Sequence, residues 1–230
     1  MTRRPAAVVF DIGETLVDES RHWGEWADWL GVPRHAFMAA LGAVIARGDH
    51  HRRVFELVRP GFDVEAELRR RSDAGWRYRI EPADFYPDAL PCLAALKARG
   101  FLVGLAGNQP QEAEAALHEA GLEADFIAAS ARWGVEKPDP RFFARVAEEA
   151  RLTPARIAYV GDRIDNDVLP AGRAGMLAVF IRRGPWGFVH AALPEAAKAD
   201  LRIEHLAELP ELLGPRLATG SGIGSATSSS

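Results

Sequence analysis

Cysteine, lysine and long apolar runs are scarce in this chain of 230 residues, and each scarcity excludes a class of protein. The one cysteine, Cys92, permits neither an internal disulfide nor a cysteine metal site. No apolar run approaches the roughly 20 residues that a membrane helix needs, and Asp11 interrupts the N-terminal apolar run too early for a signal peptide. A net charge of −4 gives no basic surface for nucleic acid. We therefore expect a cytoplasmic protein with no nucleic-acid partner and no membrane partner.

Most of the 28 lysine and arginine residues are arginine, and the only lysines are Lys97, Lys137 and Lys198. With 48% hydrophobic and 26% charged residues, the composition is otherwise that of an ordinary globular protein. The length fits one domain with a large insertion or two small domains. Each remaining lysine is therefore a candidate for a specific role.

Apolar segments with the length of buried strands alternate with helix-like segments through most of the chain. The expected strands are residues 8–10, 101–107, 125–130, 156–162 and 176–181, and the expected helices that follow the insertion are 88–100, 110–121, 138–151, 166–175 and 204–213. Strands that alternate with helices predict βαβ units and a parallel sheet, which is an α/β fold.

A helical insertion separates the first strand from the rest of this pattern. Helix-like stretches at 22–30, 34–48 and 64–79 are divided by proline- and glycine-containing breaks, with no strand-like alternation between them. We expect residues 1–16 and 85–214 to form the α/β core and residues 17–84 to form a helical cap. Residues 215–230 are of low complexity and are expected to be disordered.

Polar residues stand where several of the expected strands end. Asp11 follows the first strand, Asn108 the second, and Asp162 the fourth, while Lys137 lies in the loop after the third. The carboxyl ends of parallel strands meet at one edge of the sheet, where α/β proteins bind ligands. Two carboxylates at that edge would suit Mg²⁺, and a lysine would balance the charge of a bound anion.

Four motifs resemble those of the haloacid dehalogenase (HAD) superfamily of hydrolases, in the subclass with a helical cap. They are "DIGETL", "LVGLAGN", "EKPDPRFF" and "YVGDRIDNDVLPAGRAGM", and the resemblance runs from Ala7 to Leu213. None of these motifs alone is specific for the superfamily, but their occurrence together in this order is. The resemblance implies a Rossmann-like parallel-sheet core with an inserted helical cap domain.

The resemblance also implies the catalytic roles. Asp11 would attack phosphorus and form an aspartyl-phosphate, Lys137 would pair with Asp11 and the phosphoryl oxygens, and Asn108 would donate hydrogen bonds to the substrate. The function implied is Mg²⁺-dependent hydrolysis of a small phosphorylated metabolite, with motion of the cap admitting substrate and excluding water. Neither the substrate nor the oligomeric state follows from these motifs.

The metal site follows from the same resemblance. Asp11, the backbone carbonyl of Gly13 and Asp162 would hold Mg²⁺, and Asp167 would support it as a ligand or through water. Three acids in "GDRIDND" favour such a cation site over the dehalogenase pattern, which lacks the metal-binding acid.

Two glycines depart from the family pattern. Gly13 stands where the family has a second acid that protonates the leaving group, and Gly107 where it has a serine or threonine. A positioned general acid contributes about 10²–10⁴-fold, so its loss would favour substrates with good leaving groups without abolishing catalysis. Glu14 is a candidate replacement, although glutamate also occurs there beside an intact second acid.

Other readings of the chain stay open. A catalytically silent relative that binds or regulates would explain the two glycines, and a dehalogenase-type enzyme with an altered motif is a third reading. A phosphonatase is disfavoured because no lysine precedes Lys97.

Two groups of residues in the insertion have weaker claims. The tryptophans at 23, 26 and 29 are read as a core stripe rather than a pocket lining. The basic cluster at residues 47 and 50–53 is read as a solvated helix end rather than a site for a second anionic group.

Overall fold

The computed structural model describes residues 4–214, so the predicted disorder of residues 215–230 lies outside the described part of the chain. Within that part, six parallel strands form one sheet with the order β3-β2-β1-β4-β5-β6. The strands are β1 (Ala7–Phe10), β2 (Leu102–Gly107), β3 (Phe126–Ala129), β4 (Ile157–Gly161), β5 (Leu177–Ile181) and β6 (Leu201–Ile203). The predicted α/β class and parallel sheet are confirmed. The sixth strand was not predicted, because three residues are too few to carry a pattern.

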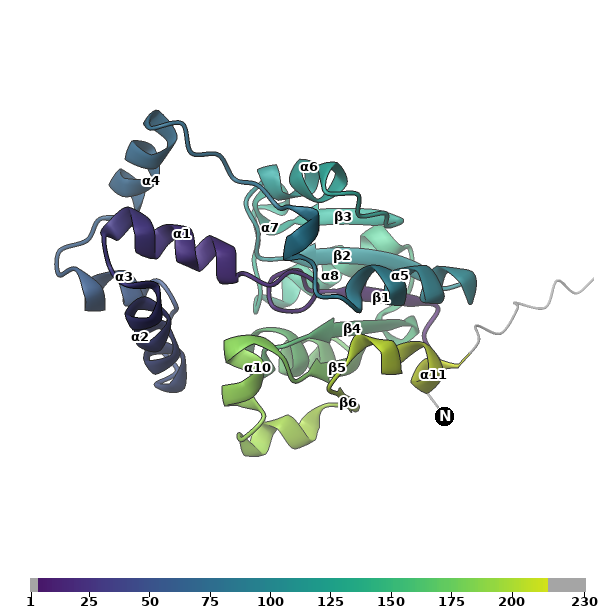
Figure 1. The fold of residues 1–230 in the computed structure, drawn as a ribbon. Coiled ribbons are helices and arrows are strands. Elements are labelled where there is room, and N and C mark those ends of the chain that lie inside the picture. The colour runs from purple at the N-terminus through teal and green to yellow at the C-terminus, as the bar shows by residue number, and fades with distance from the viewer. Residues whose placement is uncertain (1–3, 215–230) are drawn as a thin grey trace, which may run out of the picture.

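Helices cover both faces of the sheet (Figure 1). Successive side chains of a strand point to opposite faces, and β1 accordingly sends Val8 and Phe10 into one apolar core and Ala7 and Val9 into another. The first core is completed by α5 (Ala89–Ala98), α6 (Glu112–Glu119) and α11 (Leu209–Leu213), and the second by α8 (Pro140–Ala150) and α9 (Leu169–Arg173). The result is a three-layered core with β1 and β4 at the centre of the sheet.

In two of the predicted helices, a turn of another type precedes the α-helix. Where a helix was predicted at 166–175, a π-helical turn, Ile164–Val168, comes first and α9 follows it. Where a helix was predicted at 204–213, a 3₁₀ turn, Leu206–Glu208, comes first and α11 follows it. Each α-helix has a proline in its first turn, Pro170 or Pro210. Proline lacks an N–H group and fits the first turn of a helix but not its interior, so it fixes where each α-helix starts.

The insertion forms four helices that lie beyond the end of β1, on the left in Figure 1. They are α1 (Ser20–Leu30), α2 (Arg34–Ala46), α3 (Arg53–Val58) and α4 (Val64–Asp73). The sequence analysis missed α3, and α4 ends before Gly75, whose φ of 91° is left-handed. Among the described residues no single helix is long and apolar enough to cross a membrane; only the pair α1 and α2, bent by 114°, would suffice by length and composition together.

A separate apolar core holds the insertion together. It contains Trp23, Trp26 and Phe55 from the insertion and also Trp186 from α10 (Gly184–His190), which follows β5. Trp186 therefore joins two parts of the chain that are more than a hundred residues apart.

The chain enters and leaves the insertion at adjacent points. Val17 and Phe85 form an antiparallel bridge, and the Asp18 amide donates to the Asp84 carbonyl at 2.7 Å. Both bridging residues belong to the core beside the sheet. This junction lies close to the predicted boundaries at 16 and 85, which stay predictions.

Candidate active site

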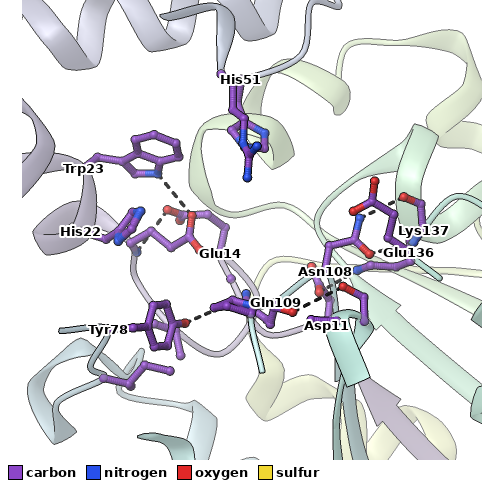
Figure 2. Close-up of a pocket in the computed structure, with 18 of the residues that line it drawn as sticks. Asp11, Glu14, His22, Trp23, His51, Tyr78, Asn108, Gln109, Glu136 and Lys137 are labelled. Atoms are coloured by element: carbon purple, nitrogen blue, oxygen red, sulfur yellow. Dashed lines mark hydrogen bonds and ion pairs between the residues drawn. The ribbon is translucent and has the colours of Figure 1, made fainter. Parts of the chain in front are cut away.

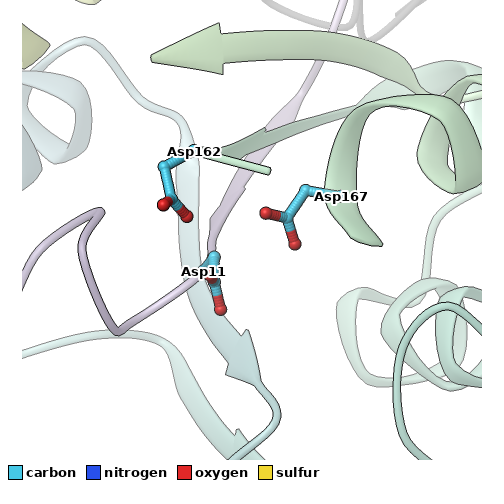
Figure 3. A group of neighbouring side chains, drawn as sticks. All are labelled: Asp11, Asp162 and Asp167. Carbon is cyan, nitrogen blue, oxygen red and sulfur yellow. The ribbon is translucent and has the colours of Figure 1, made fainter. Parts of the chain in front are cut away.

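Three aspartates meet at the carboxyl edge of the sheet. Asp11 follows β1 and Asp162 follows β4, and these strands are neighbours. Asp167 lies in the π-helical turn after β4. Each of the three offers a carboxylate oxygen within 4.8 Å of the other two, around the common space seen in Figure 3. The structure thus brings together the three acids that the sequence analysis assigned to a metal site.

Lys137 lies between two of these aspartates. Its Nζ is 2.6 Å from Asp11 Oδ1 and 2.6 Å from Asp167 Oδ1, and its side chain is buried. Burial opposes the charge of the amine, but the two carboxylates outweigh that effect and hold the pKa of Lys137 well above its ordinary value. The lysine is therefore a permanently charged group at the edge of the sheet.

Asn108 fixes the backbone that carries this lysine. Its Nδ2 donates to the Lys137 carbonyl at 2.9 Å, and its Oδ1 accepts from the Lys137 amide at 2.7 Å (Figure 2). A side-chain amide has two N–H bonds, so one of them is left to point elsewhere. The role predicted for Asn108, donation to substrate, stays a prediction beside this positioning role.

The aspartate cluster suits a divalent cation. Asp162 Oδ2 is buried without a hydrogen-bond partner in the described structure. Burial, followed by the negative charges of Asp167 and Asp11, raises the pKa of Asp162 well above its ordinary value. A cation among these oxygens would relieve both effects, and a set of hard oxygen ligands favours Mg²⁺. The carbonyl of Gly13, predicted as a further ligand, belongs to a residue that lines the same cavity.

The remaining acids of the loop after β4 have other partners. Asp165 pairs with Arg163 at 2.7 Å. Asp167 Oδ1 accepts a hydrogen bond from Lys137 Nζ at 2.6 Å, and Asp167 Oδ2 accepts one from the Arg163 amide at 3.0 Å. Both oxygens of Asp167 are thus engaged, and burial raises its pKa to about 6.

Neither of the two unexpected glycines leaves an empty space. A Cβ atom on Gly107 would lie 2.8 Å from Asp11 Oδ1, and a Cβ atom on Gly13 would lie 2.5 Å from Oε1 of Glu19. Real side chains do not approach so closely. The volume that the missing side chains would fill is therefore taken by two carboxylates of this chain.

Glu14, the predicted candidate for a replacement acid, is engaged away from that volume. It accepts from the Tyr86 hydroxyl at 2.7 Å through Oε2, and from the Glu19 amide at 3.2 Å through Oε1. Burial raises the pKa of Glu14 to about 7. Its φ of 55° gives the loop after β1 a left-handed turn.

Glu19 is a site residue that the sequence analysis missed. Its Oε2 accepts from Trp23 Nε1 at 3.2 Å, and the residue lines the same cavity as Asp11. Burial raises the pKa of Glu19 to about 8, with further contributions from the negative charges of Glu14 and Asp11. No sequence motif marks this position, because it comes eight residues after Asp11 and just before a helix.

A cavity of about 1260 Å³ connects the sheet edge with the insertion. Figure 2 shows Trp23 and His22 on one side of it and Asp11, Asn108 and Lys137 on the other. The tryptophan stripe divides: Trp23 and Trp26 are buried in the insertion core and also line the cavity, whereas Trp29 is 37% exposed. The expected core stripe is thus right for two of the three, and both of these reach the site as well.

The basic cluster of the insertion also divides. His50, His51 and Arg52 line the cavity. His50 and Arg52 are nevertheless exposed, as expected of a solvated helix end, whereas His51 is only half-buried. His51 packs edge-on against Trp23 and Trp186, with ring centroids 5.7 and 5.9 Å apart. Burial lowers the pKa of His51 to about 3, so it faces the cavity as a neutral ring.

One further contact joins the core and the insertion beside the cavity. The Tyr78 hydroxyl donates to Gln109 Oε1 at 3.0 Å, which joins the end of the insertion to the loop after β2 (Figure 2). No sequence pattern marks this pair, because neither residue belongs to a motif.

Comparisons with known proteins agree with this geometry. A family model described as haloacid dehalogenase-like hydrolase matches residues 5–175. A glyceraldehyde 3-phosphate phosphatase of Methanopyrus kandleri is 32% identical over 78% of this chain and 85% of that protein. A phosphoserine phosphatase of Thermus thermophilus is 31% identical over 80% of this chain and 78% of that protein.

Solved structures extend the likeness to the whole fold. A HAD phosphatase from Thermococcus onnurineus has 25% identity and a TM-score of 0.60 over 91% of this chain and 98% of that one. A dehalogenase solved with an intermediate has 22% identity and a TM-score of 0.69 over 94% of this chain and 100% of that one, which shows the fold alone.

Proposed function

We propose that this chain, which belongs to the haloacid dehalogenase-like hydrolases, is an Mg²⁺-dependent phosphatase that hydrolyses a small phosphorylated metabolite through an aspartyl-phosphate on Asp11. The observation that carries the proposal is the placement of Asp11 between a buried lysine and an unpartnered Asp162 oxygen. A carboxylate and a phosphate dianion repel each other, so the attack needs positive charge nearby. Lys137 supplies one such charge, and a cation held by Asp162 would supply the other. The names of the two phosphatase relatives support the same substrate class.

Each polar residue at the sheet edge has a role in this proposal. Asp11 attacks phosphorus with one oxygen, and Lys137 neutralises the phosphoryl oxygens as the bond forms. Asn108 holds the backbone of Lys137 in place and has an N–H group left for the phosphate. Asp167 keeps the lysine oriented through its 2.6 Å contact.

The metal would be held by Asp11, the Gly13 carbonyl and Asp162, with Asp167 beside them. When bound, Mg²⁺ supplies charge that draws the phosphate toward Asp11 and offsets the repulsion among the carboxylates.

The cavity sets broad limits on the substrate. The side of the cavity formed by the insertion combines aromatic rings with His50 and Arg52, which suits a small phosphate ester that carries a second polar or anionic group. The cytoplasmic location remains a prediction from the sequence.

A substrate screen tests the proposal. Phosphorylated metabolites are incubated with and without Mg²⁺, released phosphate is measured, and the phosphoenzyme is trapped by rapid acid quench. We expect Mg²⁺-dependent turnover that is lost in Asp11→Asn and kept in Asp73→Asn, which changes an exposed acid at the end of α4.

The rival readings give different results in the same screen. A silent relative would release no phosphate from any substrate, although Mg²⁺ would still raise its Tm. A dehalogenase would release halide from 2-haloacids without the metal. Either result would overturn the phosphatase proposal.

A further inference from the structure

The carboxyl group of Glu19 lies where an acid two residues after the nucleophile would place its own side chain. An atom added as Cβ on Gly13 would be 2.5 Å from Glu19 Oε1 and 3.0 Å from its carboxyl carbon. A side chain at position 13 therefore requires the carboxyl group of Glu19 to move from the place that it occupies. The chain has one carboxyl group at this place, and it comes from Glu19 rather than from position 13.

We propose that Glu19 is the proton donor and acceptor of the reaction, in the place that Gly13 leaves open; the assignment rests on the phosphatase function proposed above. In the first step an Asp11 oxygen bonds to phosphorus and the bond to the leaving oxygen breaks, while Glu19 gives its proton to that oxygen. In the second step the Glu19 carboxylate takes a proton from water, the water oxygen bonds to phosphorus, and the bond to Asp11 breaks. The proton is returned, so atoms and charge balance over the cycle.

Two contacts fix the orientation of Glu19. Trp23 Nε1 donates to Oε2 at 3.2 Å, and the Glu19 amide donates to Glu14 at 3.2 Å. With Oε2 held by the indole, Oε1 is the oxygen that faces Gly13. Trp23 is a positioning residue in this arrangement, because it acts through Glu19.

The position of Glu19 in the chain links the proton donor to the insertion. It immediately precedes α1, which carries Trp23 into the insertion core. Glu14 is less suited to the role, because both of its oxygens have donors in Tyr86 and the Glu19 amide.

A residue swap tests the assignment. The rate of phosphoenzyme formation is measured in single turnovers with two probes, p-nitrophenyl phosphate as an aryl phosphate and glycerol 1-phosphate as an alkyl phosphate. An alkoxide needs a proton to leave and a nitrophenolate does not, so Glu19→Ala should slow the alkyl probe about 100-fold and the aryl probe far less. The control Glu119→Ala, which removes an exposed glutamate at the end of α6, should change neither rate.

The second half of the swap restores an acid from the other position. Gly13→Asp in the parent meets the Glu19 carboxyl and should not accelerate the alkyl probe. Gly13→Asp together with Glu19→Ala should recover about 10-fold or more of the rate lost in Glu19→Ala, since one positioned acid replaces another. Thermal unfolding checks each variant, and the isosteric Glu19→Gln serves in place of Glu19→Ala should the alanine variant not fold.

The outcomes separate the two proposals. A parent that forms no phosphoenzyme with either probe or with any screened metabolite overturns both. A parent that does form it, with equal losses for the two probes in Glu19→Ala and Glu19→Gln, overturns the Glu19 assignment alone. A leaving-group contrast that appears in Glu14→Gln instead would transfer the role to Glu14.

Discussion

Removing the charge of Lys137 should destabilise the metal-free protein far more than removing either of the other lysines. Lys137→Met takes a cation from between Asp11 and Asp167, each 2.6 Å from its Nζ, and leaves Asp162 as a third buried acid nearby. Breaking a buried ion pair by removing one partner costs about 3–5 kcal/mol. We expect a loss in that range at pH 7.5, out of the roughly 5–15 kcal/mol typical of a whole domain.

The cost has an upper limit because the aspartates can take up protons. The pKa of a carboxyl group rises when its neighbouring cation is removed, and each unit of that rise corresponds to about 1.4 kcal/mol. Once the orphaned acids are protonated, the penalty stops growing, so the loss in Lys137→Met should be smaller at pH 5 than at pH 8. Urea unfolding in EDTA, followed by circular dichroism at both pH values, measures this difference.

Lys97→Met and Lys198→Met are the matched controls. Neither lysine has a buried partner in the described structure, and changes at such places usually stay within about 0.5 kcal/mol. Addition of Mg²⁺ should then recover part of the loss in Lys137→Met, because a second cation faces the same carboxylates. Equal free energies of unfolding for all three variants would refute the reasoning that the lysine neutralises the cluster.

Three further predictions concern other parts of the cavity. Burial lowers the pKa of His51 to about 3, so the unfolded chain binds a proton there that the folded chain does not. The stability that this histidine contributes above its unfolded pKa of about 6.5 is lost as the pH falls toward 3; His51→Gln should flatten the urea-unfolding profile across that window, whereas a change at the exposed His35 should not. Gly107→Ala places a carbon 2.8 Å from the carboxylate of the proposed nucleophile and should lower kcat/KM by about 100-fold. Gly42→Ala, whose Cβ would meet nothing within 4 Å in α2, should leave kcat/KM unchanged and stabilise the protein by about 0.5–1 kcal/mol; similar kinetics for the two alanine variants would contradict the crowding argument. Asp162→Asn should abolish the Mg²⁺-dependent rise in Tm seen by scanning fluorimetry, and an unchanged rise would place the metal elsewhere.

The parts of the site that follow strands could be predicted from the sequence. Asp11 and Asp162 come directly after apolar segments, and a parallel sheet brings such ends to one edge. Lys137 was identifiable because lysine is so rare in this chain and because "EKPDP" is a motif of the family. Local patterns therefore sufficed wherever a functional residue and the element that positions it are close in sequence.

The rest of the site depends on contacts that no local pattern encodes. Trp186 reaches the core of the insertion from α10, a helix that the sequence analysis did not predict. Glu19 reaches Gly13 because the loop after β1 turns back through Glu14 at a φ of 55° and the bridge of Gly13 with Val17. Alternation and helix periodicity describe single elements, and they carry no information on where a loop of this kind folds.

The absence of an acid at position 13 is better explained by relocation than by loss of function. A chain released from catalysis would be free to place an apolar side chain or none beside Gly13, since enclosing a carboxyl group costs free energy unless it is well paired. Here a carboxyl group is kept at that place, although its pKa is raised to about 8 and the indole of Trp23 is a neutral donor. Strongly shifted carboxyl groups in a cavity are typical of functional sites. The enclosed carboxyl group and the missing side chain coincide in one small volume, and the proton transfer proposed for Glu19 accounts for both.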